Sequence, residues 1–256
     1  MGRPRILILG GSSEARLLAE ALAVRDDCDV LLSLAGRTEK PAMQPVPVRI
    51  GGFGGAAALA AFLKAGGYDL LIDATHPFAE RISANAAFAA ETTGIAAIAL
   101  RRAEWQRLPG DRWQDVQSIP AAIEALGPSP RHVFLATGRQ GAHHAQVAPQ
   151  HRYVVRSVDP VKPPLALDKV EYILERGPFT LDGECDLLRQ HDIDAIVAKN
   201  SGGAATYAKI EAARLLGIEV MMVARAPALI VKAVETVEAA LAAINHLFPP
   251  AMKRGV

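Results

Sequence analysis

A glycine turn near the start of the chain has the residue types of an anion-binding site. Four apolar residues, Ile6 to Leu9, precede the run Gly10-Gly11-Ser12-Ser13-Glu14-Ala15. The apolar run suits a strand buried on both faces, the glycines allow a sharp turn, and Ser12 or Ser13 can cap the following helix. Free N–H groups at the positive end of a helix bind phosphate. We therefore interpret Gly10, Gly11, Ser12, Ser13 and Glu14 as the turn that binds a dinucleotide pyrophosphate.

This turn departs from the usual dinucleotide pattern, G-x-G-x-x-G, because its two glycines are adjacent. An ordinary first turn of an α/β domain is the alternative. A second strand is expected over residues 29–34, and Arg37 and Thr38 follow it where the adenosine ribose would lie. An arginine can pair with a 2′-phosphate, whereas NAD would favour an acidic residue. Arg37 and Thr38 therefore favour NADP, with a solvated loop arginine as the alternative.

Thr75 and His76 are expected at the carboxyl end of a strand over residues 70–73. Pro77 disfavours helix at His76 and can open the next helix. Ligands bind at such strand ends in open α/β sheets. His76 could contact cofactor or substrate, or supply a proton, and a histidine that braces the turn is the alternative.

Two further glycine turns follow expected strands in the second half of the chain. Lys199-Asn200-Ser201-Gly202-Gly203 presents an ammonium, an amide and a hydroxyl, which suit a pyrophosphate or a carboxylate. Thr137-Gly138-Arg139 is a similar turn with an arginine. The alternative is a structural turn with a surface lysine. We assign Thr75, Thr137, Gly138, Arg139, Lys199, Asn200 and Ser201 to cofactor binding.

The elements that must position these turns alternate regularly between strand and helix. Strands are expected over residues 6–9, 29–34, 46–50, 70–73, 95–100, 132–136, 153–158, 170–174, 194–198 and 219–223, and a final helix over 231–248. Residues 101–113 break this pattern, because they are polar and basic and hold both tryptophans. We expect an α/β fold with domains over 1–100 and 101–248 and a tail over 249–256.

Composition excludes several classes of protein. The net charge is +1, from 28 basic and 27 acidic residues, which argues against a nucleic-acid binder. Cys28 and Cys185 are isolated, so neither a zinc site nor a disulfide framework is indicated. No apolar run reaches the roughly 18 residues that cross a membrane, and the start does not resemble a signal peptide. We expect a cytoplasmic protein with no metal site and no membrane partner.

The five turns together resemble the precorrin-6A reductase family. The resemblance rests on Gly10 to Ala15, Ala35-Gly36-Arg37-Thr38, Asp73-Ala74-Thr75-His76-Pro77-Phe78-Ala79, Thr137 to Arg139 and Lys199 to Gly203, with Tyr207, Lys209 and Gly217-Ile218 in support. It extends from about Arg5 to Ala226. Ser12 stands where the family often has threonine, which keeps the hydroxyl.

The resemblance implies two Rossmann-like domains with mainly parallel sheets and a cleft between them. It implies NADPH-dependent hydride transfer to C19 of precorrin-6A, giving precorrin-6B in cobalamin biosynthesis. The substrate is an anionic tetrapyrrole, so basic residues must gather locally. The substrate-binding candidates are His76, Arg101, Arg102, Arg107, Lys162 and Arg225, and Arg139 is a further basic candidate; His76 and Lys199 are the candidate proton donors. A monomer or small homo-oligomer is expected.

Two other functions fit parts of the sequence, and a third fits poorly. A relative could reduce the cobalt-containing precursor with NADH. A non-catalytic sensor could bind NADP through Gly10 to Ala15 and Arg37. A short-chain dehydrogenase needs Tyr-x-x-x-Lys, and none of Tyr68, Tyr153, Tyr172 and Tyr207 has a lysine four residues later.

Overall fold

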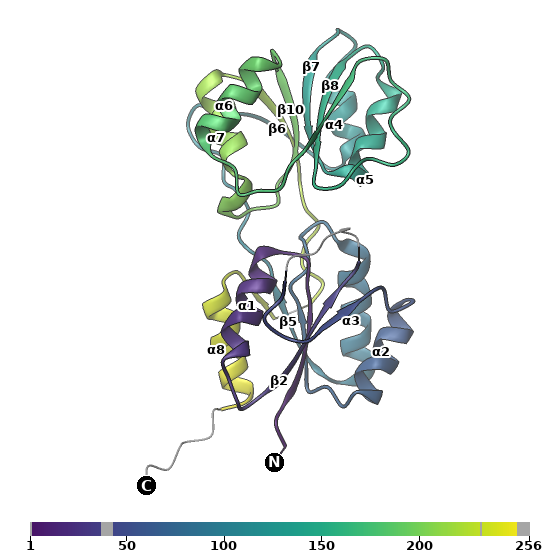
Figure 1. Cartoon of the computed structure of the whole chain (residues 1–256), viewed down its shortest axis with the longest axis vertical. Coiled ribbons are helices and arrows are strands. Elements are labelled where there is room, and N and C mark those ends of the chain that lie inside the picture. Colours follow the sequence, from purple (N-terminus) through teal and green to yellow (C-terminus); the bar gives the residue numbers. More distant parts are fainter. Residues whose placement is uncertain (1, 37–42, 231, 250–256) are drawn as a thin grey trace. The chain divides into compact units, whose positions relative to one another are not determined.

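The chain forms two α/β units, each built on one parallel sheet (Figure 1). The computed structural model describes residues 2–36, 43–230 and 232–249. Unit 1 comprises Met1–Arg102 and Ala226–Val256, and unit 2 comprises Ala103–Arg225. The prediction of two Rossmann-like parallel sheets with alternating helices is confirmed.

The sheet of unit 1 has the order β12-β5-β4-β1-β2-β3, with every neighbouring pair parallel. Its strands are β1 (Arg5–Leu9), β2 (Asp29–Leu34), β3 (Val48–Ile50), β4 (Leu70–Asp73), β5 (Ala96–Leu100) and β12 (Ala233–Val234). Its helices are α1 (Ser13–Ala23), α2 (Ala56–Ala65), α3 (Glu80–Thr93) and α8 (Val237–Leu247). β3 lies at one edge of this sheet, a position that tolerates the nearby prolines Pro45 and Pro47.

The central strand β1 is apolar throughout its buried length because helices cover both faces of the sheet. Ile6 and Ile8 pack in one cluster with residues of α1 and α8, whereas Leu7 and Leu9 pack with residues of α2 and α3. Figure 1 shows α8 beside α1 and α2 beside α3. The four apolar side chains of β1, Ile6 to Leu9, are at most 2% exposed, so the strand that leads to Gly10 is fixed from both sides.

The sheet of unit 2 has the order β6-β11-β10-β7-β8-β9 and is also parallel. Its strands are β6 (Arg112–Val116), β7 (His132–Ala136), β8 (Arg152–Ser157), β9 (Val170–Leu174), β10 (Ala195–Lys199) and β11 (Glu219–Val223). Its α-helices are α4 (Ile119–Ala125), α5 (Arg139–Ala142), α6 (Leu181–Gln190) and α7 (Ala208–Leu216), and its 3₁₀ helices are η1 (His143–Val147) and η2 (Ala204–Thr206).

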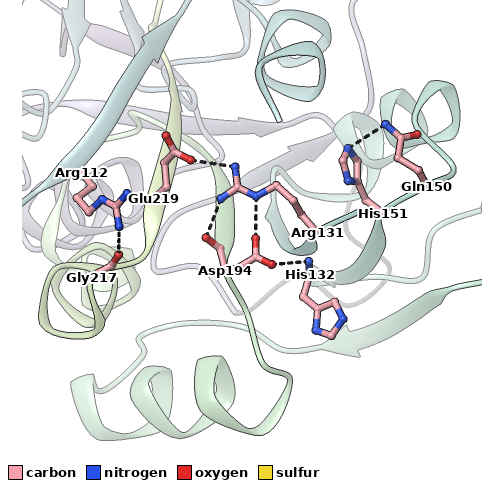
Figure 2. A network of polar contacts seen from close by, with 8 residues as sticks. All are labelled: Arg112, Arg131, His132, Gln150, His151, Asp194, Gly217 and Glu219. Atoms are coloured by element: carbon pink, nitrogen blue, oxygen red, sulfur yellow. Dashed lines mark hydrogen bonds and ion pairs between the residues drawn. The ribbon is translucent and has the colours of Figure 1, made fainter. Parts of the chain in front are cut away.

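A polar network joins the amino ends of three strands of this sheet (Figure 2). The guanidinium of Arg131, directly before β7, donates to Asp194 Oδ1 and Glu219 Oε2, each at 2.8 Å. The other carboxylate oxygen of Asp194 accepts from the backbone N–H of His132 at 3.0 Å. Arg131 therefore fixes the amino ends of β7, β10 and β11. The glycine turns lie at the opposite, carboxyl ends of β7 and β10.

Two parts of the expected organisation are wrong. The second domain was expected over residues 101–248, but Ala226–Val256 belong to unit 1, because β12 pairs with β5 and α8 packs against α1. The final helix begins at Val237 instead of residue 231. Val231 and residues 250–256 of the expected tail lie outside the described residues. In the part of the chain that is described, no helix is long and apolar enough to cross a membrane.

Candidate functional site

The predicted turns lie at the point in each sheet where the strand order reverses. In unit 1 the order runs from β1 toward β2 and β3 on one side and from β4 toward β5 on the other. In unit 2 the same reversal falls between β7 and β10. Ligands of open α/β sheets bind outside the carboxyl ends of the strands at such reversals. The turns that follow β1, β4, β7 and β10 are the four that hold the described candidates for cofactor binding.

The turn after β1 is shaped by Gly11 and Ser12. Gly11 has φ +133°, and a Cβ at this position would meet no atom within 4 Å, so the backbone faces open space. Ser12 Oγ accepts from the N–H of Ala15 at 3.1 Å and donates to the carbonyl of Ala74 at 2.8 Å. Ser12 therefore caps α1 and joins the turn after β1 to the turn after β4.

Glu14 lies in the first turn of α1 and pairs with Arg102 at 2.8 Å. Burial alone would raise the pKa of Glu14, but the charge and hydrogen bonds of Arg102 outweigh it, so the pKa is lowered. Arg101 donates to the carbonyls of Pro77 and Ala226. In this structure the predicted substrate ligands Arg101 and Arg102 therefore hold the turns of unit 1.

The turn after β4 is organised by a buried carboxylate. Asp73 Oδ1 accepts from the Thr75 hydroxyl at 2.6 Å and from the Thr75 N–H at 3.1 Å. Asp73 and Thr75 are 3% and 8% exposed. His76 follows on this fixed turn, and its Nδ1 accepts from the N–H of Phe78 at 3.2 Å. Thr75 donates its hydroxyl proton within the turn, so only its lone pairs remain for a ligand.

The turns after β7 and β10 are neighbours in unit 2 because these strands pair directly. The ammonium of Lys199 donates to the carbonyl of Thr137 at 2.9 Å, which joins the two turns. The Thr137 hydroxyl is buried and has no hydrogen-bond partner among the described residues. Gly138, Gly202 and Gly203 have positive φ angles. Thr137 and Lys199, both assigned to cofactor binding from the sequence, therefore lie next to each other.

Asn200 and Ser201 are both buried, at 8% and 7% exposure. The side-chain amide of Asn200 accepts a hydrogen bond from the backbone N–H of Trp105 and donates one to the backbone carbonyl of Trp105. Its side chain is thus used in supporting the turn. Ser201 lies between Asn200 and Gly202, where its N–H donates to the carbonyl of Lys199 at 2.7 Å.

The remaining basic candidates have different surroundings. Arg107 pairs with Asp115 at 2.9 Å, and Arg225 pairs with Glu104 at 2.7 Å. Lys162 is exposed and Arg139, at the start of α5, is half-buried. Arg37 and Thr38 lie outside the described residues.

Two side chains that order loops at the carboxyl ends of strands were not among the predicted site residues. Asp73 orders the turn after β4, and its place two residues before Thr75 in the sequence was the available signal. Arg49 stacks over the ring of Phe53 at 4.0 Å and donates to the carbonyl of Gly52, at the carboxyl end of β3. Its position before a glycine run was a weaker signal.

A buried ion pair in unit 2 was also missed. Arg156 and Glu184 are 7% and 2% exposed and share two hydrogen bonds, at 2.5 and 3.1 Å. The residues stand 28 positions apart, on β8 and α6, and no local pattern pairs them. Among the residues described, no group of three or more His, Cys, Asp or Glu side chains could hold a metal ion.

The chain is similar over almost its full length to proteins of one family. The family model for precorrin-6x reductase CbiJ/CobK matches residues 5–245. A precorrin-6A reductase of Sinorhizobium sp is 59% identical over 98% of this chain and 96% of its own. One from Rhodobacter capsulatus is 48% identical over 86% of this chain and 88% of its own.

A solved structure agrees with the fold as a whole. The structure of CobK precorrin-6A reductase has a TM-score of 0.91 with this chain at 44% identity, covering 99% of this chain and 100% of the other. The chain therefore belongs to the precorrin-6x reductase CbiJ/CobK family.

Proposed function

We propose that the chain reduces precorrin-6A to precorrin-6B with NADPH, by hydride transfer to C19 of the macrocycle, in cobalamin biosynthesis. The observation that carries the proposal is the position of the candidate residues at the strand-order reversal of each sheet. The chain's relatives at 48% and 59% identity are named precorrin-6A reductases and match it nearly end to end. The metal-free substrate is therefore preferred to the cobalt-containing one.

The residues present are suited to a dinucleotide. The open backbone beside Gly11 and the capped start of α1 would receive the pyrophosphate, with Gly10, Ser12 and Ser13. The buried Thr137 hydroxyl lacks a partner among the described residues, which favours a polar ligand at the unit 2 turns. Arg37 and Thr38 would bind the 2′-phosphate and so select NADPH over NADH. NADPH would supply the hydride when bound.

The protein's own part is to hold the reactants and any proton that moves. His76 is held by Phe78 through Nδ1, so its Nε2 side is the one we assign to the ligand. Lys199 would place a positive charge beside Thr137, toward a phosphate or a substrate carboxylate. Lys162 and Arg139 are candidates for contact with the substrate's acidic arms, because Lys162 is exposed and Arg139 is half-buried at the start of α5. Arg101, Arg102, Arg107 and Arg225 would act mainly by holding turns, since each has an intramolecular partner.

Turnover assays test the proposal against its alternatives. NADPH oxidation should require precorrin-6A and should be slower with NADH. Binding of NADP⁺ without turnover would favour a sensor, and faster turnover of cobalt-precorrin-6A with NADH would favour the cobalt-specific reaction. Arg37→Ala should raise the KM for NADPH much more than the KM for NADH. An equal effect on both KM values would contradict the role of Arg37.

A further inference from the structure

We propose that Trp105 is a positioning residue for the turn formed by Lys199 to Gly203, which we call the Lys199 turn. Trp105 does this by fixing Asn200 and Gly203, the residues that enclose Ser201 and Gly202. The inference rests on the proposed function, because the ligand expected at this turn is NADPH. Trp105 lies in the segment that precedes β6, where the sequence showed only a break in the alternation of strand and helix.

Trp105 and Asn200 recognise each other through two hydrogen bonds. The N–H of Trp105 donates to Asn200 Oδ1 at 2.9 Å, and Asn200 Nδ2 donates to the carbonyl of Trp105 at 3.1 Å. Both polar atoms of the amide are used, and the site is buried. An aspartate at position 200 would lack the N–H donor, and a leucine would lack both the donor and the acceptor. Among side chains of this length, only asparagine can make both hydrogen bonds. The backbone of Trp105 therefore fixes the first half of the turn.

The indole ring fixes the second half. Trp105 Nε1 donates to the carbonyl of Gly203 at 2.8 Å. Gly202 and Gly203 have φ angles of +66° and +78°. Glycine adopts such positive φ angles readily, but it loses more conformational freedom on folding than any other residue. A hydrogen bond to Gly203 selects one conformation of this flexible pair. Trp105 therefore contacts the turn on both sides of Ser201.

Trp105 is itself held by the helical segments that follow the turn. Its ring is 8% exposed, lies 5.8 Å from the Tyr207 ring, and has the Lys209 ammonium 4.7 Å from its centroid. Lys209 is 5% exposed and also donates to the carbonyl of Thr206. A buried cation over an indole is a favourable contact. The ring is thus rigid enough to set the position of Gly203.

The order imposed on the turn matters for binding because a preset turn loses less entropy when it takes a ligand. Lys199 is held at the other end by its bond to the carbonyl of Thr137. The backbone N–H groups of the glycine pair and the Lys199 ammonium would then meet a phosphate without rearranging. Loss of the Trp105 contacts should weaken cofactor binding even though Trp105 itself is not expected to touch the cofactor.

The chain provides a matched control in its other tryptophan. Trp113 is 9% exposed and lies in the same apolar cluster as Trp105. Its indole nitrogen is buried and has no hydrogen-bond partner within the described part of the chain. Trp105→Phe removes a hydrogen bond to Gly203, whereas Trp113→Phe removes an N–H that makes none. The two substitutions remove the same atoms from similar surroundings.

Calorimetric titration with NADP⁺ compares wild type, Trp105→Phe, Asn200→Ala and Trp113→Phe. We expect the Kd for NADP⁺ to rise about tenfold in Trp105→Phe and Asn200→Ala and to stay within about twofold in Trp113→Phe. Wild-type affinity in Trp105→Phe would overturn the inference, and so would an equal loss in Trp113→Phe. If Asn200→Ala does not fold, the conservative Trp105→Phe decides.

Steady-state kinetics separate this inference from the proposed function. Trp105→Phe should raise the KM for NADPH and leave kcat within about twofold, whereas a general loss of structure would lower apparent kcat at unchanged KM. That second pattern would overturn the inference. A wild type that binds NADP⁺ but does not reduce precorrin-6A would refute the reductase alone, with the titration still deciding the role of Trp105. A wild type that does not bind NADP⁺ would refute both.

Discussion

The backbone N–H of Phe78 donates a hydrogen bond to Nδ1 of His76 over 3.2 Å. An accepting Nδ1 carries no proton, so we assign the proton of the neutral ring to Nε2. Protonating the whole ring would turn Nδ1 into a second donor and break this bond. We therefore favour a role in which His76 donates a hydrogen bond through Nε2. The alternative is a general acid, which gives its proton to the substrate and takes up another.

Substitution of His76 separates these two roles. Glutamine has an N–H near the position of Nε2, so His76→Gln should keep kcat within about tenfold of wild type if donation alone is needed. His76→Leu should lose about 100-fold, a loss as large as that of a general acid. The measurement is kcat for precorrin-6A reduction under saturating NADPH. Equal losses in both variants would instead indicate proton transfer by His76.

Thr137→Val tests the ligand expected at the unit 2 turns. The Thr137 hydroxyl is buried and without a partner among the described residues, so its removal should leave the Tm of the ligand-free protein unchanged or raise it. The same change should weaken NADP⁺ binding by about tenfold. Thr93→Val is the control, because Thr93 donates to the carbonyl of Ala89 at 2.6 Å. Thr93→Val should lower the Tm and leave the Kd for NADP⁺ unchanged. A Kd for NADP⁺ that is also unchanged in Thr137→Val would argue against a hydrogen bond between Thr137 and the ligand.

Gly11→Ala tests the turn after β1. The φ of Gly11 is +133°, so an alanine should cost on the order of 1–3 kcal/mol of stability and shift the N–H groups proposed to bind the pyrophosphate. Gly94→Ala places a similar strain at φ +70°, at the end of α3. Both variants should have a lower Tm, but only Gly11→Ala should raise the KM for NADPH. A KM for NADPH that stays at the wild-type value in Gly11→Ala would place the pyrophosphate elsewhere.

His151 should make stability depend on pH. Burial, followed by the charge of Arg131, lowers the pKa of His151 (Figure 2 shows both side chains). The unfolded chain therefore binds this proton more readily, so stability present above the unfolded pKa of about 6.5 is lost as the pH falls below it. Urea unfolding from about pH 8 to about pH 5 should show a steeper loss for wild type than for His151→Gln.

The exposed His144 gives the control for this measurement. His144→Gln should follow wild type across the whole pH range. If His151→Gln loses stability as steeply as wild type does, His151 is not the group responsible.

Local sequence was enough to predict the strands that are buried on both faces. Leu70–Asp73 and His132–Ala136 have the expected bounds, because short apolar runs between turn residues leave little choice of where the strand begins and ends. The glycine turns at their ends were predictable for the same reason. Their places at the two strand-order reversals follow from the regular alternation of strand and helix.

Features set by distant contacts could not be read from local patterns. Strand β12 has two residues, too few for any periodicity, and its pairing with β5 is what returns the C-terminal segment to unit 1. The pairs Arg102–Glu14 and Trp105–Asn200 join residues 88 and 95 positions apart. Such pairs give a partner to a side chain whose neighbours in sequence do not reveal it, as Glu14 does for Arg102.

Isotope transfer from the cofactor tests the central claim most directly. NADPH that carries deuterium at C4 of the nicotinamide, on each face in separate reactions, should be incubated with the enzyme and precorrin-6A. We predict that one of the two labels transfers a single deuterium to C19 of the product, detected by mass spectrometry and NMR. A reduced product that carries no deuterium from either label would contradict the account.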